Sequence, residues 1–262
     1  MPPETKPGRV LLVGAGPGAA DLMTVRALRA VQGAQALLYD ALISEEVLAL
    51  APAACLKIQT GKRAGRASMR QETINRLMLR LARRGLTVVR LKGGDPSVFG
   101  RVGEEQAFLH AHGIETEVVP GVTAASAAAA QFGFPLTHRG EARRVVLSTA
   151  RLEAGALQTD WSAAADPQAT LAIYMGGAEA AELSRRLIAA GRPARTPVAV
   201  VERASCPDAR LTRTTLAGLG AAPVGEGPVL IVVGEAAGRA QAAGFDTTAA
   251  AFQVSRTARI EA

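Results

Sequence analysis

The sequence predicts an α/β protein of two domains, and three observations point to this class. The 262 residues are enough for two domains of ordinary size. Nearly half of the residues are apolar while only 3% are aromatic, a composition typical of Ala, Val and Leu side chains packed between helices and a parallel sheet. Short apolar runs alternate with stretches of helical spacing, which indicates strands and helices in turn.

The first 120 residues account for one predicted domain. Ser44, followed by two acidic residues, has the pattern of a helix N-cap, and Gly85 has that of the residue after a helix C-terminus. Strands are expected at residues 9–13, 35–39, 87–91 and 115–119, and helices at residues 24–32, 70–84 and 103–112. This alternation predicts a parallel sheet covered by helices.

Pro120 and Gly121 mark a break, after which the alternation resumes. Helices are expected at residues 123–131 and 178–190, and strands at residues 144–148, 170–175, 197–202 and 228–233. The predicted domains are therefore an N-terminal α/β domain, 1–120, and a C-terminal α/β domain, 121–238. Residues 239–262 are expected to form a poorly ordered tail or a docking segment.

The net charge of +7 indicates an anionic partner, either a nucleic acid, a membrane surface or an acidic small molecule. Arginine supplies most of the positive charge and forms bidentate bonds with carboxylates, although a genome rich in Arg codons also explains its excess over lysine. The chain begins with no apolar leader and contains no apolar run of about 18 residues, so we expect a cytoplasmic protein without a membrane partner. Cys55 and Cys206 lack metal-ligand spacing, and no metal is expected.

Two glycine-rich segments follow predicted strands. The loop from Gly14 to Gly18 lets a ligand approach the backbone closely, but Pro17 lacks the N–H that a phosphate cradle uses, which disfavours NAD. A tight turn without a ligand is the alternative. Gly93-Gly94-Asp95-Pro96 lies at the strand end where open α/β sheets bind ligands, and its alternative role is a helix N-cap at Asp95.

Candidate charged residues also lie near strand ends. Asp40 directly follows the second strand, where a carboxylate could accept a proton or stabilise a cation. The alternative is a solvated loop residue or a cap. Lys62 lies in a basic loop at residues 60–65 that could enclose an anion or be exposed. A cleft for an anion is suggested by further cations at Arg101, His138, Arg139, Arg143 and Arg144.

Taken in order, the segments 13–18, 39–40, 61–65, 89–96, 119–125 and 135–139 resemble the tetrapyrrole methylase family. The resemblance runs from about residue 10 to residue 234, and the segments 61–65, 91–95 and 135–139 are similar to the branch that acts on uroporphyrinogen III. It implies two α/β domains with the active site in the cleft between them, in a homodimer. The chain departs from the family pattern at Ser97, where the family often has an aromatic residue, and at Val102 and Ala204, where it often has glycine.

The resemblance also implies the chemistry. S-adenosylmethionine would donate methyl groups to C2 and C7 of uroporphyrinogen III, giving precorrin-2 through precorrin-1 and releasing S-adenosylhomocysteine. Asp40 matches a proton acceptor and Lys62 a proton donor. The residues implied to bind the cofactor are Pro17, Gly93, Gly94, Asp95, Val98, Thr123, Ala124, Met175 and Ala204, and those expected to bind the substrate are Arg101, His138 and Arg139.

Besides a dinucleotide-binding oxidoreductase, which the glycine spacing disfavours, two other interpretations stay open. One is a methylase of a later cobalamin precursor, of the precorrin-4 type. The other is a basic protein that binds nucleic acid without catalysis. The single Trp and two Tyr provide few side chains for stacking on bases, so no nucleic-acid partner is expected.

Overall fold

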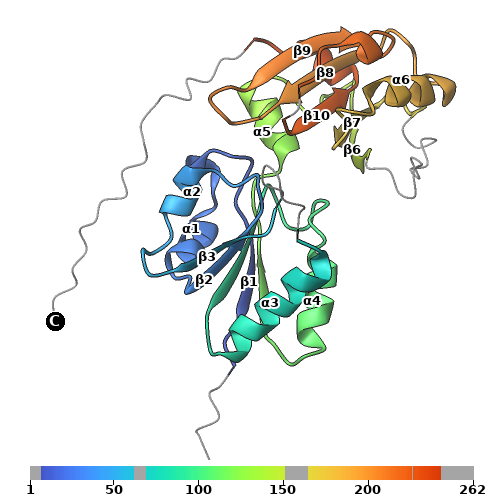
Figure 1. Ribbon diagram of the computed structural model, residues 1–262. Coiled ribbons are helices and arrows are strands. Elements are labelled where there is room, and N and C mark those ends of the chain that lie inside the picture. The colour runs from blue at the N-terminus through green and yellow to red at the C-terminus, as the bar shows by residue number, and fades with distance from the viewer. Residues whose placement is uncertain (1–6, 62–68, 151–164, 226, 243–262) are drawn as a thin grey trace, which may run out of the picture.

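The computed structural model describes residues 7–61, 69–150, 165–225 and 227–242, which form two five-stranded sheets with helices packed on them (Figure 1). The predicted α/β class is therefore confirmed. The chain passes from one sheet to the other directly after residue 119. The predicted domain boundary at residue 120 falls in this connection and stays a prediction.

The first sheet is parallel throughout, with the strand order β3-β2-β4-β1-β5. Successive side chains of a strand point to opposite faces, so Leu11 and Val13 belong to one apolar layer and Val10 and Leu12 to the other. The strands are β1 (Val10–Gly14), β2 (Ala36–Tyr39), β3 (Leu56–Gln59), β4 (Val88–Lys92) and β5 (Thr116–Val119).

Two helices cover each face of this sheet. One face packs against α1 (Val25–Gln32) and α2 (Glu45–Ala49), and the other packs against α3 (Gln71–Arg83) and α4 (Val102–His110). The predicted N-cap is confirmed, because the Ser44 hydroxyl accepts the N–H of Val47. Gly85, with φ of 81°, follows the end of α3 as expected.

The topology marks one place on this sheet for a ligand. β1 and β4 are neighbours, yet the next α-helices after them, α1 and α4, cover opposite faces. Open α/β sheets bind ligands outside the carboxyl ends of two such strands. In Figure 1 these carboxyl ends point toward the second sheet. The loops after β1 and β4 are therefore the candidate site.

The second sheet is mixed, with the order β6-β7-β10-β8-β9, and β6–β7 is its one parallel pair. α6 packs on one face, and α5 packs on the other with a 3-10 helix, η4. The elements are α5 (Ala124–Gln131), β6 (Arg144–Thr149), β7 (Ala169–Tyr174), α6 (Ala180–Ala189), β8 (Pro197–Glu202), β9 (Arg210–Thr215), β10 (Val229–Val233) and the 3-10 helices η1 (Ala20–Leu22), η3 (Leu219–Ala221) and η4 (Glu235–Arg239).

The structure agrees with the predicted strands within one residue but adds β3 and β9. Both lie at a sheet edge and carry polar or exposed side chains, so their sequences lack the apolar run that reveals a buried strand. The expected helix-strand alternation of the second half is limited, since β8, β9 and β10 follow one another without an α-helix.

The predicted tail begins inside η4, and its first residues are packed. Ala240 is buried, and the N–H of Gln241 donates to the carbonyl oxygen of Phe132 at 2.8 Å. Residues 243–262 of the tail lie outside the described residues. Among the residues that are described, no helix has the length and apolar character needed to cross a bilayer.

Three glycines cross where the two sheets join. A Cβ on Gly14 would lie 2.6 Å from the carbonyl oxygen of Gly94 and 2.7 Å from the backbone nitrogen of Gly121. A Cβ on Gly121 would collide with the same Gly94 oxygen. The close approach of these three backbone segments is therefore possible only without side chains, which explains glycine at positions 14 and 121 independently of any ligand.

We expect Gly14→Ala to lower the free energy of unfolding by about 3 kcal/mol, because backbone atoms cannot make room for the added methyl group. Gly103→Ala is the matched control: this glycine lies in α4 with nothing within 4 Å of its added Cβ. The control should gain about 0.5–1 kcal/mol from helix propensity. Urea titration measures both values, and a Gly14→Ala protein as stable as the wild type would contradict the crossing.

Candidate functional site

The two predicted glycine loops contact each other directly. Gly16 and Gly94 form an antiparallel bridge. The N–H of Gly94 donates to the carbonyl oxygen of Gly16 at 2.7 Å, and the N–H of Gly16 donates to the carbonyl oxygen of Gly94 at 3.2 Å. Both residues have positive φ, 77° and 68°, which glycine adopts without strain. The bridge places Pro17 beside the Gly93-Gly94-Asp95 segment, at the ligand position that the topology marks.

Asp40 joins this group from the end of β2. Its Oδ2 accepts the N–H of Gly93 at 3.4 Å, and its Oδ1 accepts the N–H of Leu42 at 3.0 Å. The side chain of Leu42 is 57% exposed beside it. The structure thus brings the predicted proton acceptor to the predicted cofactor loop. Lys62, the predicted proton donor, lies outside the described residues.

Asp95 links its loop to the connection between the sheets. Its Oδ2 accepts the N–H of Gly121 at 2.9 Å, and its Oδ1 accepts both the N–H of Ser97, at 2.8 Å, and the Ser97 hydroxyl. Burial opposes ionisation of Asp95, but the hydrogen bonds from Ser97 and Gly121 outweigh burial and lower its pKa. The N-cap interpretation of Asp95 is wrong, because α4 begins only at Val102 and Asp95 forms a turn instead.

Ser97 is one of the departures from the family pattern, and the structure gives it a role. A hydroxyl at this position reaches back two residues to the Asp95 carboxylate, which an aromatic side chain could not do. Val98 completes the turn, since its N–H donates to the carbonyl oxygen of Asp95 at 3.1 Å. Val102, the second departure, is the first residue of α4.

A buried charge cluster supports the end of β4 from the α4 side. Glu105 is fully buried and bonds Lys92 Nζ at 2.8 Å, Arg90 Nε at 3.3 Å and Gln71 Nε2 at 3.0 Å. Burial lowers the pKa of Lys92 and the charge of Arg90 lowers it further, while Glu105 and Asp40 oppose both effects. The sequence pattern does not distinguish Glu105, because the helix dipole already accounts for an acidic residue in the first turn of a helix.

The second sheet contributes a wall through Tyr174, the last residue of β7. Its hydroxyl lies 2.6 Å from the Thr123 hydroxyl and accepts the N–H of Ala125 at 3.3 Å. Its ring packs against Phe99, with centroids 5.2 Å apart. These contacts hold the start of α5, with Thr123 and Ala124, next to the loop that follows β4. The sequence did not predict that Tyr174 belongs to the site, although it is one of only two tyrosines in the chain.

Met175 and Ala204 follow strands of the second sheet. Met175 has φ of 57° and is 46% exposed, so its apolar side chain is available to a ligand. Ala204 is buried in the apolar cluster that includes α5. The residue after it contacts the loop of Pro17, because the Ser205 hydroxyl accepts the N–H of Ala19 at 3.2 Å. The segments that carry the nine predicted cofactor residues are therefore connected by direct contacts.

The predicted substrate-binding cations are not gathered in the same way. Arg101 forms two hydrogen bonds with Glu104, at 2.8 and 2.6 Å. The N–H of His138 donates to Ala142 at 2.9 Å, in a small loop that also contains the exposed Arg139. Arg144 pairs with Asp166 at 2.6 Å. Arg101 and Arg144 thus already have acidic partners, and the contacts of His138 lie within its own loop.

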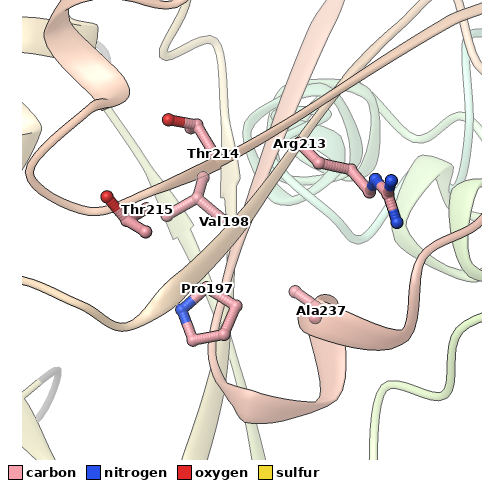
Figure 2. A pocket seen from close by; sticks show the side chains of 7 residues that line it. Pro197, Val198, Arg213, Thr214, Thr215 and Ala237 are labelled. Atoms are coloured by element: carbon pink, nitrogen blue, oxygen red, sulfur yellow. The ribbon is translucent and has the colours of Figure 1, made fainter.

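A separate hollow of about 380 Å³ contains none of the predicted site residues (Figure 2). It opens to solvent between β8, β9 and η4 and is lined by Pro197, Val198, Arg213, Thr214, Thr215, Ala237 and Gly238. Because it lies away from the carboxyl ends of β1 and β4, the joined loops remain the candidate site. Within the described parts of the chain, His, Cys, Asp and Glu form no group of three or more suited to a metal ion.

This arrangement of two sheets and joined glycine loops is that of a methylase family. Residues 9–220 match the family of Tetrapyrrole (Corrin/Porphyrin) Methylases, and the chain belongs to it. It is 48% identical over 238 residues to the uroporphyrinogen-III C-methyltransferase of Paracoccus denitrificans. The aligned region covers 89% of this chain and 83% of that protein. It is 49% identical over 229 residues to the siroheme synthase of Sodalis glossinidius, covering 87% of this chain and 49% of that one.

Solved structures show the same fold. The uroporphyrin-III C-methyltransferase of Thermus thermophilus, in complex with S-adenosylhomocysteine, matches with a TM-score of 0.76 at 43% identity, covering 87% of this chain and 93% of that one. A cobalt precorrin-4 methyltransferase matches with the same TM-score at 31% identity, covering 87% and 95%.

We expect Asp95→Asn to lower the free energy of unfolding at pH 7 by about 1–2 kcal/mol, since a neutral amide accepts these hydrogen bonds less strongly. The pKa of Asp95 is lowered in the folded protein, so its stabilisation is present above the ordinary carboxyl pKa and is lost as the pH falls through the lowered value. The difference between wild type and variant should therefore vanish in acid.

Denaturant titrations from pH 7 to pH 3 measure that difference. Asp21→Asn, at an exposed carboxylate of η1, is the control and should stay close to the wild type throughout. A difference for Asp95→Asn that is the same at pH 3 as at pH 7 would show that the ionised carboxylate does not hold the turn.

Proposed function

We propose that this protein is a uroporphyrinogen-III C-methyltransferase, which transfers methyl groups from S-adenosylmethionine to C2 and C7 of uroporphyrinogen III and forms precorrin-2 through precorrin-1. The observation that carries the proposal is the convergence of both sheets on the two joined glycine loops, in a chain 48% identical to the Paracoccus enzyme. The likeness to the Thermus enzyme bound to S-adenosylhomocysteine supports the same cofactor.

The residues at the loops fit an adenosyl sulfur compound. A Cβ on Gly94 would meet only Thr123 Cα, at 4.0 Å, so there is room above this backbone. Tyr174 and the exposed Met175 supply apolar surface, and Pro17 lies on the other loop. The bound cofactor supplies an electrophilic methyl group on a positively charged sulfur. The protein's part is to hold that group in line with the substrate carbon and to exclude water.

Asp40 is proposed as the proton acceptor. The pyrrole carbon that gains a methyl group must afterwards lose a proton, and Asp40 lies beside the cofactor loop with its carboxylate fixed by two backbone N–H groups. Lys62 is proposed as the proton donor on the basis of the family resemblance. Neither residue forms a covalent intermediate in this proposal, so their contribution is proton transfer at positioned atoms.

Substrate binding is proposed to use Arg101, His138 and Arg139. Uroporphyrinogen III carries eight carboxylates, which suits a chain with a net charge of +7 that is rich in arginine. Because Arg101 is paired with Glu104, a substrate carboxylate there would share or replace an existing ion pair. The cytoplasmic location, the homodimer and the domain limits at residues 120 and 238 belong to the same proposal.

A methylase of a later corrin precursor is the second candidate. The cobalt precorrin-4 methyltransferase has the same TM-score as the uroporphyrin enzyme, but at lower identity, 31% against 43%. The siroheme synthases are about twice as long as the matched region, so only the activity of that region is relevant here.

The first test is the reaction itself. Purified protein with S-adenosylmethionine and uroporphyrinogen III should give a product heavier by two methyl groups in mass spectrometry, with an intermediate heavier by one. Precorrin-4 in place of uroporphyrinogen III is the comparison. Methylation of precorrin-4 alone would favour the second candidate, and methylation of neither would contradict both.

Asp40→Asn should reduce kcat by about 10²–10⁴-fold, the usual contribution of general base catalysis, while KM changes much less. The amide keeps the shape of the side chain but cannot accept the proton. Glu72→Gln, at an exposed carboxylate on α3, is the control and should have the wild-type kcat. A wild-type kcat for Asp40→Asn would remove this residue from the mechanism.

A further inference from the structure

The peptide unit between Gly18 and Ala19 is held on both sides by serine hydroxyls. Its carbonyl oxygen accepts the Ser44 hydroxyl at 3.0 Å, and its N–H donates to the Ser205 hydroxyl at 3.2 Å. Ser44 caps α2 beside the first sheet, whereas Ser205 lies in the turn between β8 and β9 of the second. One peptide therefore connects the loop of Pro17 to the opposite half of the molecule.

The turn and the loop are packed as closely as a residue without a side chain allows. A Cβ on Gly18 would lie 2.9 Å from Cys206 Sγ and 3.2 Å from Ser205 Oγ. The Ser205 hydroxyl is thus in contact with the backbone of the loop and bonded to its N–H. Any widening at this point would lengthen the hydrogen bond between the Ala19 N–H and the Ser205 hydroxyl.

The turn keeps this position at a conformational cost. Arg203 and Ser205 have φ of 49° and 66°, values that residues with side chains rarely adopt. The buried Gln131 fixes Ser205 by accepting its N–H at 2.7 Å, and Arg203 donates its N–H to Pro228 at 2.9 Å. Glycine would adopt this φ without strain, so what serine adds here is its hydroxyl.

We propose that Ser205 is a positioning residue for methyl transfer, whose hydroxyl holds the loop of Pro17 against the second sheet and so sets the width of the cofactor end of the site. The proposal rests on the proposed function. Pro17 directly precedes Gly18 and Ala204 directly precedes Ser205, so each of the two joined segments carries a predicted cofactor contact. Binding of the cofactor between them depends on their separation.

The test compares Ser205→Gly with Ser205→Ala by calorimetry with S-adenosylhomocysteine. Both variants lose the hydroxyl, but glycine also relieves the positive φ, so loss of affinity with Ser205→Gly is not explained by a damaged turn. We expect a Kd about 3- to 10-fold above the wild type for both, the usual effect of one hydrogen bond. The KM for S-adenosylmethionine should rise by the same factor, with kcat less affected.

Ser184→Ala is the matched control, because it removes another buried serine hydroxyl. Ser184 lies on α6, and its hydroxyl donates to the carbonyl oxygen of Leu216 at 2.6 Å. This variant should leave the Kd for S-adenosylhomocysteine unchanged. A wild-type Kd for Ser205→Gly would reduce Ser205 to a turn residue, and an equal loss with Ser184→Ala would show general loosening; either result overturns the proposal. Failure of the wild type itself to bind S-adenosylhomocysteine would instead overturn the proposed function.

Discussion

The close crossing of three backbone segments at Gly14, Gly94 and Gly121 is the constraint on which the rest of the site depends. It brings the ends of β1 and β4 against the connection between the sheets, with no side chain between them. The Gly16–Gly94 bridge and the Asp95–Gly121 hydrogen bond are both possible only because of this approach. Glycine therefore has two functions here: it permits the packing at two positions and leaves open space above a third.

Buried charged residues support the same site from the α4 side of the first sheet. Glu105, Lys92 and Arg90 are buried on the α4 side of β4, directly before the glycine segment. Buried ions of this kind are costly unless all partners are present, so the cluster holds α4 and β4 in one arrangement. The loop above it can then be rich in glycine and still have a defined shape. The apolar side chains of Leu42, Phe99 and Met175 are exposed in the loops that follow β2, β4 and β7.

Much of the fold and part of the site could be predicted from the sequence. Buried strands have continuous apolar runs, which identified eight of them, whereas the edge strands β3 and β9 are polar and were missed. Pro17, Asp40 and Asp95 stood out because they follow strands of a parallel sheet. Tyr174, Ser205 and Glu105 could not be found in this way, because their roles depend on partners 49, 186 and 13 residues distant in sequence.

The position of Gly121 has a consequence for building chimeras from related methylases. The residue that joins the two halves is itself part of the crossing, and its N–H is bound by Asp95 of the first half. A C-terminal half transplanted at residue 120 would therefore bring Gly121 but would leave Gly14 and Gly94 behind. Exchange of halves between relatives would succeed only where the recipient supplies glycine at 14 and 94 together with a carboxylate at 95.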